Sequence, residues 1–164
     1  KFVAGEREGH KVLTKPFLDQ GSERSNLYIG TSSMSGYTIQ ADLLGSLKGR
    51  KRPDMGLING RYILDLMGGH KRLEIRDWEE RRLQKTVDFP MEPDVWYTMQ
   101  MRVDVVSDKA QIRGKLWKTG TPEPAAWTIE VDDPLPMRQG SPGLYGYSAA
   151  DIFYDNVKVM VNPK

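Results

Sequence analysis

The stretch YTMQMRVDVVSDKAQIRGKLW, residues 97–117, decides the class of fold. Apolar residues stand at alternate positions in its first half, and the same alternation resumes in its second half. Successive side chains of a β-strand point to opposite faces, so this period of two predicts two half-buried strands. Ser107, Asp108 and Lys109 separate the strands, which is short enough for a hairpin. The side chains expected on the core face are Tyr97, Met99, Met101, Val103, Val105, Ala110, Ile112, Gly114 and Leu116.

Strand features recur along most of the chain. No segment of comparable length shows the three- and four-residue spacing of an amphipathic helix. Many short strands, with 16 glycines and 10 prolines among them, predict an all-β fold with enough strands for two packed antiparallel sheets. The segments expected to form further strands are 26–30, 37–44, 56–66, 72–78, 127–131 and 151–161.

Length and composition restrict the class of protein. The 164 residues fit a single domain, 1–164, and the absence of cysteine excludes disulfides and thiolate metal sites. Lys and Arg number 24 against 22 Asp and Glu, and the basic run at 48–52 has no interleaved aromatics, so nucleic acid is not expected as a partner. No apolar run is long enough for a membrane span. Because the chain starts without methionine, in what is expected to be a strand, we expect a domain excised from a longer protein.

The segment GSPGLYGYSAADIFYDNVKV, residues 140–159, contains closely spaced glycines. A phosphate-binding glycine loop needs a helix after it, whereas an alternating, β-branched segment follows Gly146. The glycines are therefore expected at tight turns and at close contacts between neighbouring strands.

Asp155 conflicts with the alternation of this last segment. Strict alternation with Phe153 on the core side would bury the carboxylate of Asp155, which would then need a partner. A β-bulge at Asp155 and Asn156 resets the register and places Ile152 and Tyr154 in the core. A calcium ion held by Asp155 and nearby backbone carbonyls is the alternative.

The predicted strand LEIRDW, residues 73–78, carries side chains suited to carbohydrate. Glu74, Arg76 and Trp78 alternate with Leu73 and Ile75, so the three are expected together and exposed on the face away from the core. An indole offers a flat surface to the apolar side of a pyranose, and charged groups can bond its hydroxyls. The alternative is that Trp78 ends the sheet and packs on Arg76. Residues near the adjacent predicted strand that would widen such a site are Asn59, Arg61 and Tyr62.

Several motifs carry a resemblance to a known family: YTIQADLLGS (37–46), GLINGRYILDLMG (56–68), KLWKTGTPEPAAW (115–127) and DIFYDNVKV (151–159). From Lys11 onward the chain resembles the C-terminal domain of bacterial proteins with PQQ-binding-like β-propeller repeats. More distantly it is similar to the concanavalin A-like superfamily of lectins and glucanases, including 3-keto-disaccharide hydrolase-like domains. The resemblance implies a concanavalin A-like jelly-roll β-sandwich with a concave ligand-binding face and a calcium ion on the opposite side. It also implies a secreted or periplasmic bacterial protein with an upstream β-propeller as a partner.

The resemblance to glucanases implies catalytic carboxylates two residues apart on one strand face. The nearest segment here has Arg76 two residues after Glu74, and Glu80 lies roughly 20 Å farther along a strand. Glycosidases place their two carboxyl groups about 5 to 9.5 Å apart, so this segment does not supply the pair. A pair from separate strands, Glu74 with Asp65 or Asp42, is left open.

These observations support one leading hypothesis and two alternatives. The leading hypothesis is a non-catalytic carbohydrate-binding module, monomeric, which binds a polysaccharide or oligosaccharide on a concave sheet face. The first alternative is a glycoside hydrolase or lyase with carboxylates from several strands. The second is a structural domain that docks on the propeller. Calcium is the only cofactor expected, and neither nucleic acid nor a membrane is expected as a partner.

Overall fold

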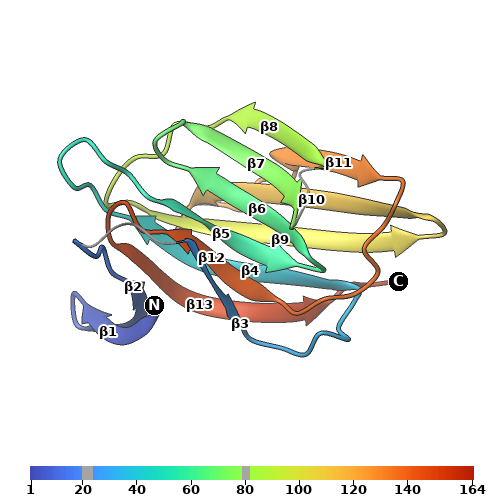
Figure 1. The fold of residues 1–164 in the computed structure, drawn as a ribbon, viewed down its shortest axis with the longest axis horizontal. Helices are drawn as coiled ribbons and strands as arrows, with labels where there is room; N and C mark the ends of the chain where they lie inside the picture. The colour runs from blue at the N-terminus through green and yellow to red at the C-terminus, as the bar shows by residue number, and fades with distance from the viewer. Residues whose placement is uncertain (20–23, 79–81) are drawn as a thin grey trace.

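The computed structural model describes residues 1–19, 24–78 and 82–164. Within these ranges it contains 13 β-strands and no helix, hence none long and apolar enough to cross a membrane (Figure 1). The all-β class predicted from the sequence is confirmed. In chain order the strands are β1 (Val3–Arg7), β2 (His10–Lys15), β3 (Arg24–Tyr28), β4 (Tyr37–Gly45), β5 (Asp54–Asn59), β6 (Tyr62–Met67), β7 (Arg72–Asp77), β8 (Gln84–Asp88), β9 (Trp96–Val106), β10 (Lys109–Lys118), β11 (Ile129–Asp133), β12 (Gly143–Tyr147) and β13 (Ile152–Val161).

The strands form two antiparallel sheets that lie over one another (Figure 1). The seven-stranded sheet has the order β1-β2-β13-β4-β9-β10-β11, and the six-stranded sheet has the order β3-β12-β5-β6-β7-β8. The hairpin predicted in the 97–117 segment is present, because β9 pairs with β10 from Tyr97 opposite Lys118 to Val106 opposite Lys109. The molecule is therefore the predicted jelly-roll β-sandwich.

The last two strands link the two sheets. β12 lies between β3 and β5, whereas β13 lies between β2 and β4, and residues 148–151 cross from one sheet to the other. A Cβ added at Gly143 would lie 2.7 Å from the carbonyl oxygen of Leu27 in the neighbouring strand β3, so the predicted close approach of neighbouring strands is confirmed. At Gly146 the close contact is with the opposite sheet, where the hydroxyl of Tyr154 would lie 2.6 Å from an added Cβ. Gly143 and Gly146 nevertheless lie within β12 rather than in turns.

The core lies between the sheets and is built from their alternating side chains. The residues expected on the core face of the 97–117 hairpin are buried, except for Val105, which is half-buried against the core. Trp127 opens the segment 127–131, which the sequence predicts as a strand with Trp127 and Ile129 on one face, but its side chain is not on the core side with Ile129. Its ring lies 5.3 Å from the guanidinium of Arg113 and 4.8 Å from Lys115 Nζ, whose side chains are on the outer face of the seven-stranded sheet. Because β11 begins only at Ile129, its alternation does not extend back to Trp127.

A β-bulge in β13 resolves the conflict at Asp155. The register of β13 against β4 shifts between Asp155 and Lys158, and Asn156 adopts a φ of 50°. Ile152 and Tyr154, before the bulge, are fully buried, so the predicted bulge is confirmed. The Asp155 carboxylate accepts a hydrogen bond from the N–H of Asn156 at 2.8 Å. The described part of the chain contains no cluster of three or more His, Asp or Glu side chains able to hold a metal, and calcium at Asp155 stays a prediction.

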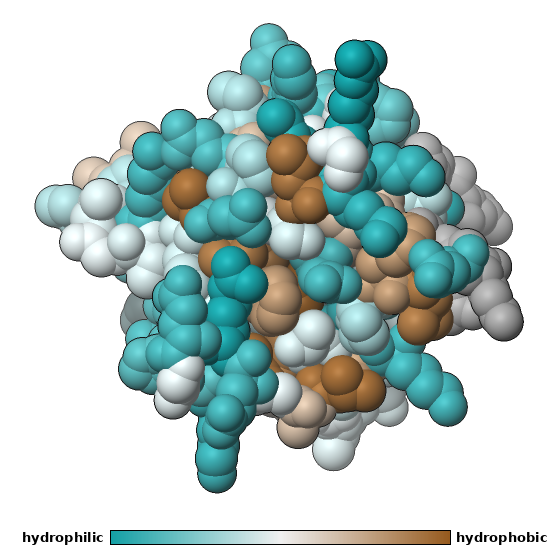
Figure 2. All heavy atoms as spheres, turned by 90° about the vertical axis from the view of Figure 1, so that its left-hand side faces the viewer, coloured by the Kyte–Doolittle hydropathy of each residue, from teal (hydrophilic) through white to brown (hydrophobic). Residues whose placement is uncertain are grey.

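One end of the sandwich, the left-hand side of Figure 1, is shown in space-filling form in Figure 2. Hydrophobic side chains lie there in separate spots among hydrophilic ones, rather than in one continuous patch. The described residues visible in this view therefore do not form one large apolar surface.

Candidate functional site

The outer face of the six-stranded sheet carries part of the predicted site. On β7, Leu73 and Ile75 point into the core, whereas Glu74 and Arg76 alternate with them on the outer face. This confirms the face predicted for the two charged residues. Trp78 lies one residue beyond the end of β7 and is 38% exposed. Glu80 lies outside the described residues.

Strand pairing brings residues of five other strands into one row with Glu74. Glu74 is opposite Asp65 of β6, Asp65 is opposite Gly56 of β5, and Gly56 is opposite Tyr145 of β12. Because Gly56 has no side chain, the side chains around it can reach across the middle of the sheet. The complete row, one residue from each strand, is Asn26, Tyr145, Gly56, Asp65, Glu74 and Thr86.

Arg76 joins these residues into a charged network. Its Nη1 donates to Asp65 Oδ2 at 2.7 Å and to Glu74 Oε1 at 3.2 Å, and its guanidinium lies 5.1 Å from the centroid of the Tyr145 ring. Gln84 of β8 donates to the other oxygen of Glu74 at 2.7 Å. Asp65 and Glu74 are each 1% exposed and Arg76 is 7% exposed. The expectation that Glu74 and Arg76 are exposed is wrong, because both side chains lie along the sheet and bond to neighbouring strands.

Three polar atoms on this face are buried without a hydrogen-bond partner in the described part of the chain. They are Asp65 Oδ1, Arg72 Nε and the hydroxyl of Tyr145. Such an atom costs about 1–3 kcal/mol and is rare in native proteins. The other two, Nε of Arg7 and of Arg113, belong to guanidinium groups that stack on aromatic rings. Unused hydrogen-bonding capacity is therefore concentrated on the outer face of the six-stranded sheet.

Burial alters the protonation of two carboxyl groups on this face. Desolvation raises the pKa of Asp65 to about 7, although Arg76 opposes the change. Desolvation also raises the pKa of Asp54 of β5, and the charges of His70 and Arg24 oppose that rise. Near neutral pH the Asp65 carboxyl group can therefore serve as a hydrogen-bond donor or acceptor.

Asn59 and Tyr62 do not lie on the outer face, which corrects the expectation that they widen the site. Asn59 is 1% exposed, and its Nδ2 donates to the carbonyls of Tyr37 and Met101 in the opposite sheet, both at 2.9 Å. Tyr62 is fully buried and donates its hydroxyl proton to Asp133 of β11. The alternation of β5 and β6 directs both side chains inward, where they connect the two sheets.

Arg61 lies at the edge of the outer face. It occupies the turn between β5 and β6 with a φ of 72° and lines a pocket of about 450 Å³. Tyr28 of the edge strand β3 also lines this pocket and is 51% exposed. Tyr28 is two residues beyond Asn26 and so shares its face. The other lining residues are Ser32, Gln139, Gly140 and Ser141.

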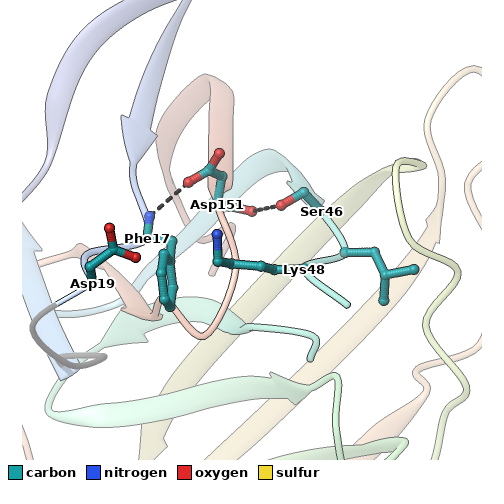
Figure 3. Close-up of a pocket in the computed structure, with 6 residues that line it drawn as sticks. Phe17, Asp19, Ser46, Lys48 and Asp151 are labelled. Atoms are coloured by element: carbon teal, nitrogen blue, oxygen red, sulfur yellow. Dashed lines mark hydrogen bonds between the residues drawn. The ribbon is translucent and has the colours of Figure 1, made fainter. Parts of the chain in front are cut away.

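A different, polar pocket of about 400 Å³ lies where the loops after β2, β4 and β12 meet (Figure 3). The Asp151 carbonyl accepts bonds from the N–H and the hydroxyl of Ser46, both at 2.9 Å, and its carboxylate accepts one from the N–H of Phe17 at 2.7 Å. Lys48 Nζ lies 4.4 Å from the centroid of the Phe17 ring. Ser46 and Asp151 thus hold three loops together.

Sequence reasoning did not single out Tyr28, Asp54 or Tyr145, and it named Asp65 only as an open partner for Glu74. A signal for Asp65 exists, because it is the one charged residue in YILDLM at 62–67. A charge within an otherwise apolar strand needs a polar partner on the same face. Tyr145 carries no such signal, since an aromatic residue between glycines is equally compatible with the core.

The sequence matches no family model and no curated protein. Solved structures do share the fold. The carbohydrate binding module CBM66 from Bacillus subtilis has a TM-score of 0.66 at 15% identity, over 97% of this chain and 91% of that one. The Caenorhabditis elegans galectin LEC-6 has a TM-score of 0.55 at 11% identity, over 90% and 95% of the two chains. A β-1,3-glucanase from Mycobacterium marinum has a TM-score of 0.54 at 16% identity, over 96% and 72%.

The chain shares the jelly-roll β-sandwich fold of these structures. At these identities the likeness concerns the fold alone, and the fold hosts binding modules, lectins and glucanases. The expected β-propeller partner and the secreted or periplasmic location stay predictions.

Proposed function

We propose that the protein is a carbohydrate-binding module whose ligand occupies the outer face of the six-stranded sheet. The observation that carries this proposal is the group of unpartnered buried atoms, Asp65 Oδ1, Arg72 Nε and the Tyr145 hydroxyl. The folds of binding modules and lectins among the similar structures support it at the level of architecture. Trp78, with its partly exposed ring, remains a proposed stacking surface beside Glu74 and Arg76.

A sugar hydroxyl matches these atoms because it donates one hydrogen bond and accepts others. Hydroxyls of one sugar can donate to Asp65 Oδ1 and accept from Arg72 Nε, which belong to adjacent rows of this face. A neighbouring hydroxyl can bond to Tyr145. All three atoms are buried, so ligand entry requires the side chains over them to shift. Single-module affinities from millimolar to micromolar correspond to about −4 to −8 kcal/mol, which a few such bonds and a stacked ring can supply.

Calorimetric titration with a panel of neutral and acidic oligosaccharides tests this function. Arg72→Ala is expected to weaken binding about tenfold or more, because it removes a charged donor. Arg113→Ala is the matched control: Arg113 also has an unpartnered Nε but lies on the opposite sheet. If no sugar binds, or if both variants bind like the parent, the proposal fails.

A second candidate function is glycoside hydrolysis, favoured by one observation. Asp65 and Glu74 come from adjacent strands, and Arg76 Nη1 bonds to both carboxyl groups at 2.7 and 3.2 Å. Their separation is thus of the order of the about 5 Å found between the carboxyl groups of retaining glycosidases. The raised pKa of Asp65 suits a general acid, with Glu74 as the nucleophile.

Turnover of chromogenic and 3-keto glycosides distinguishes the two candidates. An enzyme is expected to hydrolyse at least one of them and to lose the activity in Glu74→Gln. A binding module is expected to bind sugar without turnover, and its Glu74→Gln variant should lose affinity at most.

A further inference from the structure

We propose that the pocket between Tyr28 and Arg61 is a second sugar subsite, so that the protein recognises an oligosaccharide rather than a single sugar. This inference rests on the proposed carbohydrate function. The pocket has a volume of about 450 Å³ and is lined by Tyr28, Ser32, Arg61, Gln139, Gly140 and Ser141. It lies apart from the Asp65 and Arg72 cluster, at the β3 edge of the same sheet.

The lining matches the two sides of a sugar ring. Tyr28 is 51% exposed and presents an aromatic surface for the apolar side of the ring. Hydroxyl groups at Ser32 and Ser141, the amide of Gln139 and the guanidinium of Arg61 supply donors and acceptors for sugar hydroxyls. None of the described residues that line the pocket carries a carboxylate, and their polar groups are suited to neutral sugars.

The pocket is built on a fixed frame. Tyr37, 2% exposed, accepts a hydrogen bond from the N–H of Gly60 at 3.0 Å and donates one to the carbonyl of Gly140 at 2.7 Å. The N–H of Gly140 donates in turn to the carbonyl of Met34 at 2.9 Å. The buried hydroxyl thus joins the segments at Gly60 and Gly140, and the N–H of Gly140 joins the second of these to the loop at Met34. A pocket formed before the ligand arrives loses less entropy when it binds.

Arg61 occupies the second position of the two-residue turn between β5 and β6. Its φ of 72° and the φ of 59° at Gly60 both lie in the left-handed region, as a tight β-hairpin turn of this kind requires. Glycine fits that position without strain, so Arg61→Gly removes the side chain and keeps the turn.

Register places the two subsites on one surface. Tyr28 belongs to the row Tyr28, Gly143, Ile58, Ile63, Arg76 and Gln84, which adjoins the row of Asp65. Neighbouring strands are about 4.8 Å apart, so three strand steps from β3 to β6 separate Tyr28 from the Asp65 strand by roughly 14 Å. That distance is longer than one sugar ring and suits a short oligosaccharide.

Calorimetric titration with two probe series, from one to six units of β-1,3-linked glucose and of β-linked galactose, tests the inference. The parent is expected to bind the longer members of at least one series about tenfold more tightly than the monosaccharide. Tyr28→Ala and Arg61→Gly are each expected to remove that gain and to leave monosaccharide affinity unchanged. Arg61→Gly suits the backbone, so a loss of affinity in this variant cannot be attributed to a damaged turn. Trp117→Ala, on the opposite sheet, serves as the control.

The outcomes separate this inference from the proposed function. If short and long members bind with equal affinity, or if both variants still bind the longer members more tightly to the same extent, the second subsite is overturned. Carbohydrate binding itself then stays in place. Failure of the parent to bind any member of either series overturns this inference. If the broader panel then also shows no binding, the proposed function fails with it.

Discussion

Tyr145 and Tyr154 are both buried tyrosines, but only one of their hydroxyls has a partner. Tyr154 donates to the carbonyl of Tyr145 at 2.7 Å, whereas the Tyr145 hydroxyl bonds to none of the described residues. We expect Tyr145→Phe to leave the free energy of unfolding unchanged or to raise it by up to about 1 kcal/mol, because an unsatisfied group is removed. Tyr154→Phe should lower it by about 1 kcal/mol. Urea unfolding of both variants measures the difference, and equal losses would contradict the assignment.

Asp65 predicts an unusual dependence of stability on pH. Its pKa of about 7 in the folded protein lies above the value of about 3.9 in an unfolded chain. The folded state therefore binds more protons between these two values, and the free energy of unfolding should fall as pH rises from 4 to 7. At 1.36 kcal/mol per pKa unit the fall is up to about 4 kcal/mol.

The matching variant is Asp65→Asn, whose free energy of unfolding should change less between about pH 4 and 7. Denaturant unfolding at several pH values tests this prediction, and parallel curves for Asp65→Asn and the parent would rule out Asp65 as the source.

Asp104 contributes to the pH dependence of stability over a different pH range. Although burial opposes the effect, hydrogen bonds from Arg102 and Arg113 hold its pKa below the usual value. Its stabilisation is thus fully present above about pH 4 and is lost at lower pH. The same unfolding experiments, continued below about pH 4, measure the contribution of Asp104.

At the level of the elements, β12 depends on glycine for its close packing against the opposite sheet. A Cβ at Gly146 would meet the Tyr154 hydroxyl at 2.6 Å and Lys15 Cδ at 2.8 Å, whereas a Cβ at Gly69 would meet no atom within 4 Å. We expect Gly146→Ala to destabilise the protein by about 1–3 kcal/mol through overpacking. Gly69→Ala, in the turn between β6 and β7, should change stability by less than about 0.5 kcal/mol. Thermal unfolding compares the two, and equal stability would contradict the packing argument.

Alternation predicted the long strands well because each of them has one face in the core. The hairpin of β9 and β10 and the inward residues of β4 and β7 follow from this rule alone. Alternation did not predict β8, since its side chains are mostly exposed and QKTVD has no apolar face. It also left β12 as glycine-rich turns, because close packing of Gly143 and Gly146 depends on strands distant in sequence.

The candidate site followed from the sequence only in part. Period two fixes the face of Glu74 and Arg76, but it does not fix how a long side chain lies on that face. Arg76 lies toward Asp65 because β6 and β7 pair in a register that a local pattern does not contain. Asn59 and Tyr62 were misplaced for a related reason. Their polar groups indicate a surface, yet the opposite sheet supplies their hydrogen-bond partners.

At the scale of the whole molecule, polar side chains connect the two sheets across the apolar core. Asn59 and Tyr62 of the six-stranded sheet bond to Tyr37, Met101 and Asp133 of the other. The crossing from β12 to β13 adds a covalent connection between them. Unfolding of one sheet would expose the core face of the other and break these bonds. We therefore expect the two sheets to unfold in one cooperative transition.

Asn59 offers the sharpest test of this coupling. Asn59→Ala removes the donor to two carbonyls of the seven-stranded sheet, and we expect the free energy of unfolding to fall by about 2–3 kcal/mol. Asn26→Ala, at an outer-face position with one exposed bond of 3.3 Å, should change it by less than about 0.5 kcal/mol. In urea the Asn59 variant should show a lower midpoint with the same slope, because the surface exposed on unfolding is the same. A second transition in that variant would mean that the sheets are held together chiefly by Asn59, whereas an unchanged midpoint would show that the apolar core alone couples them.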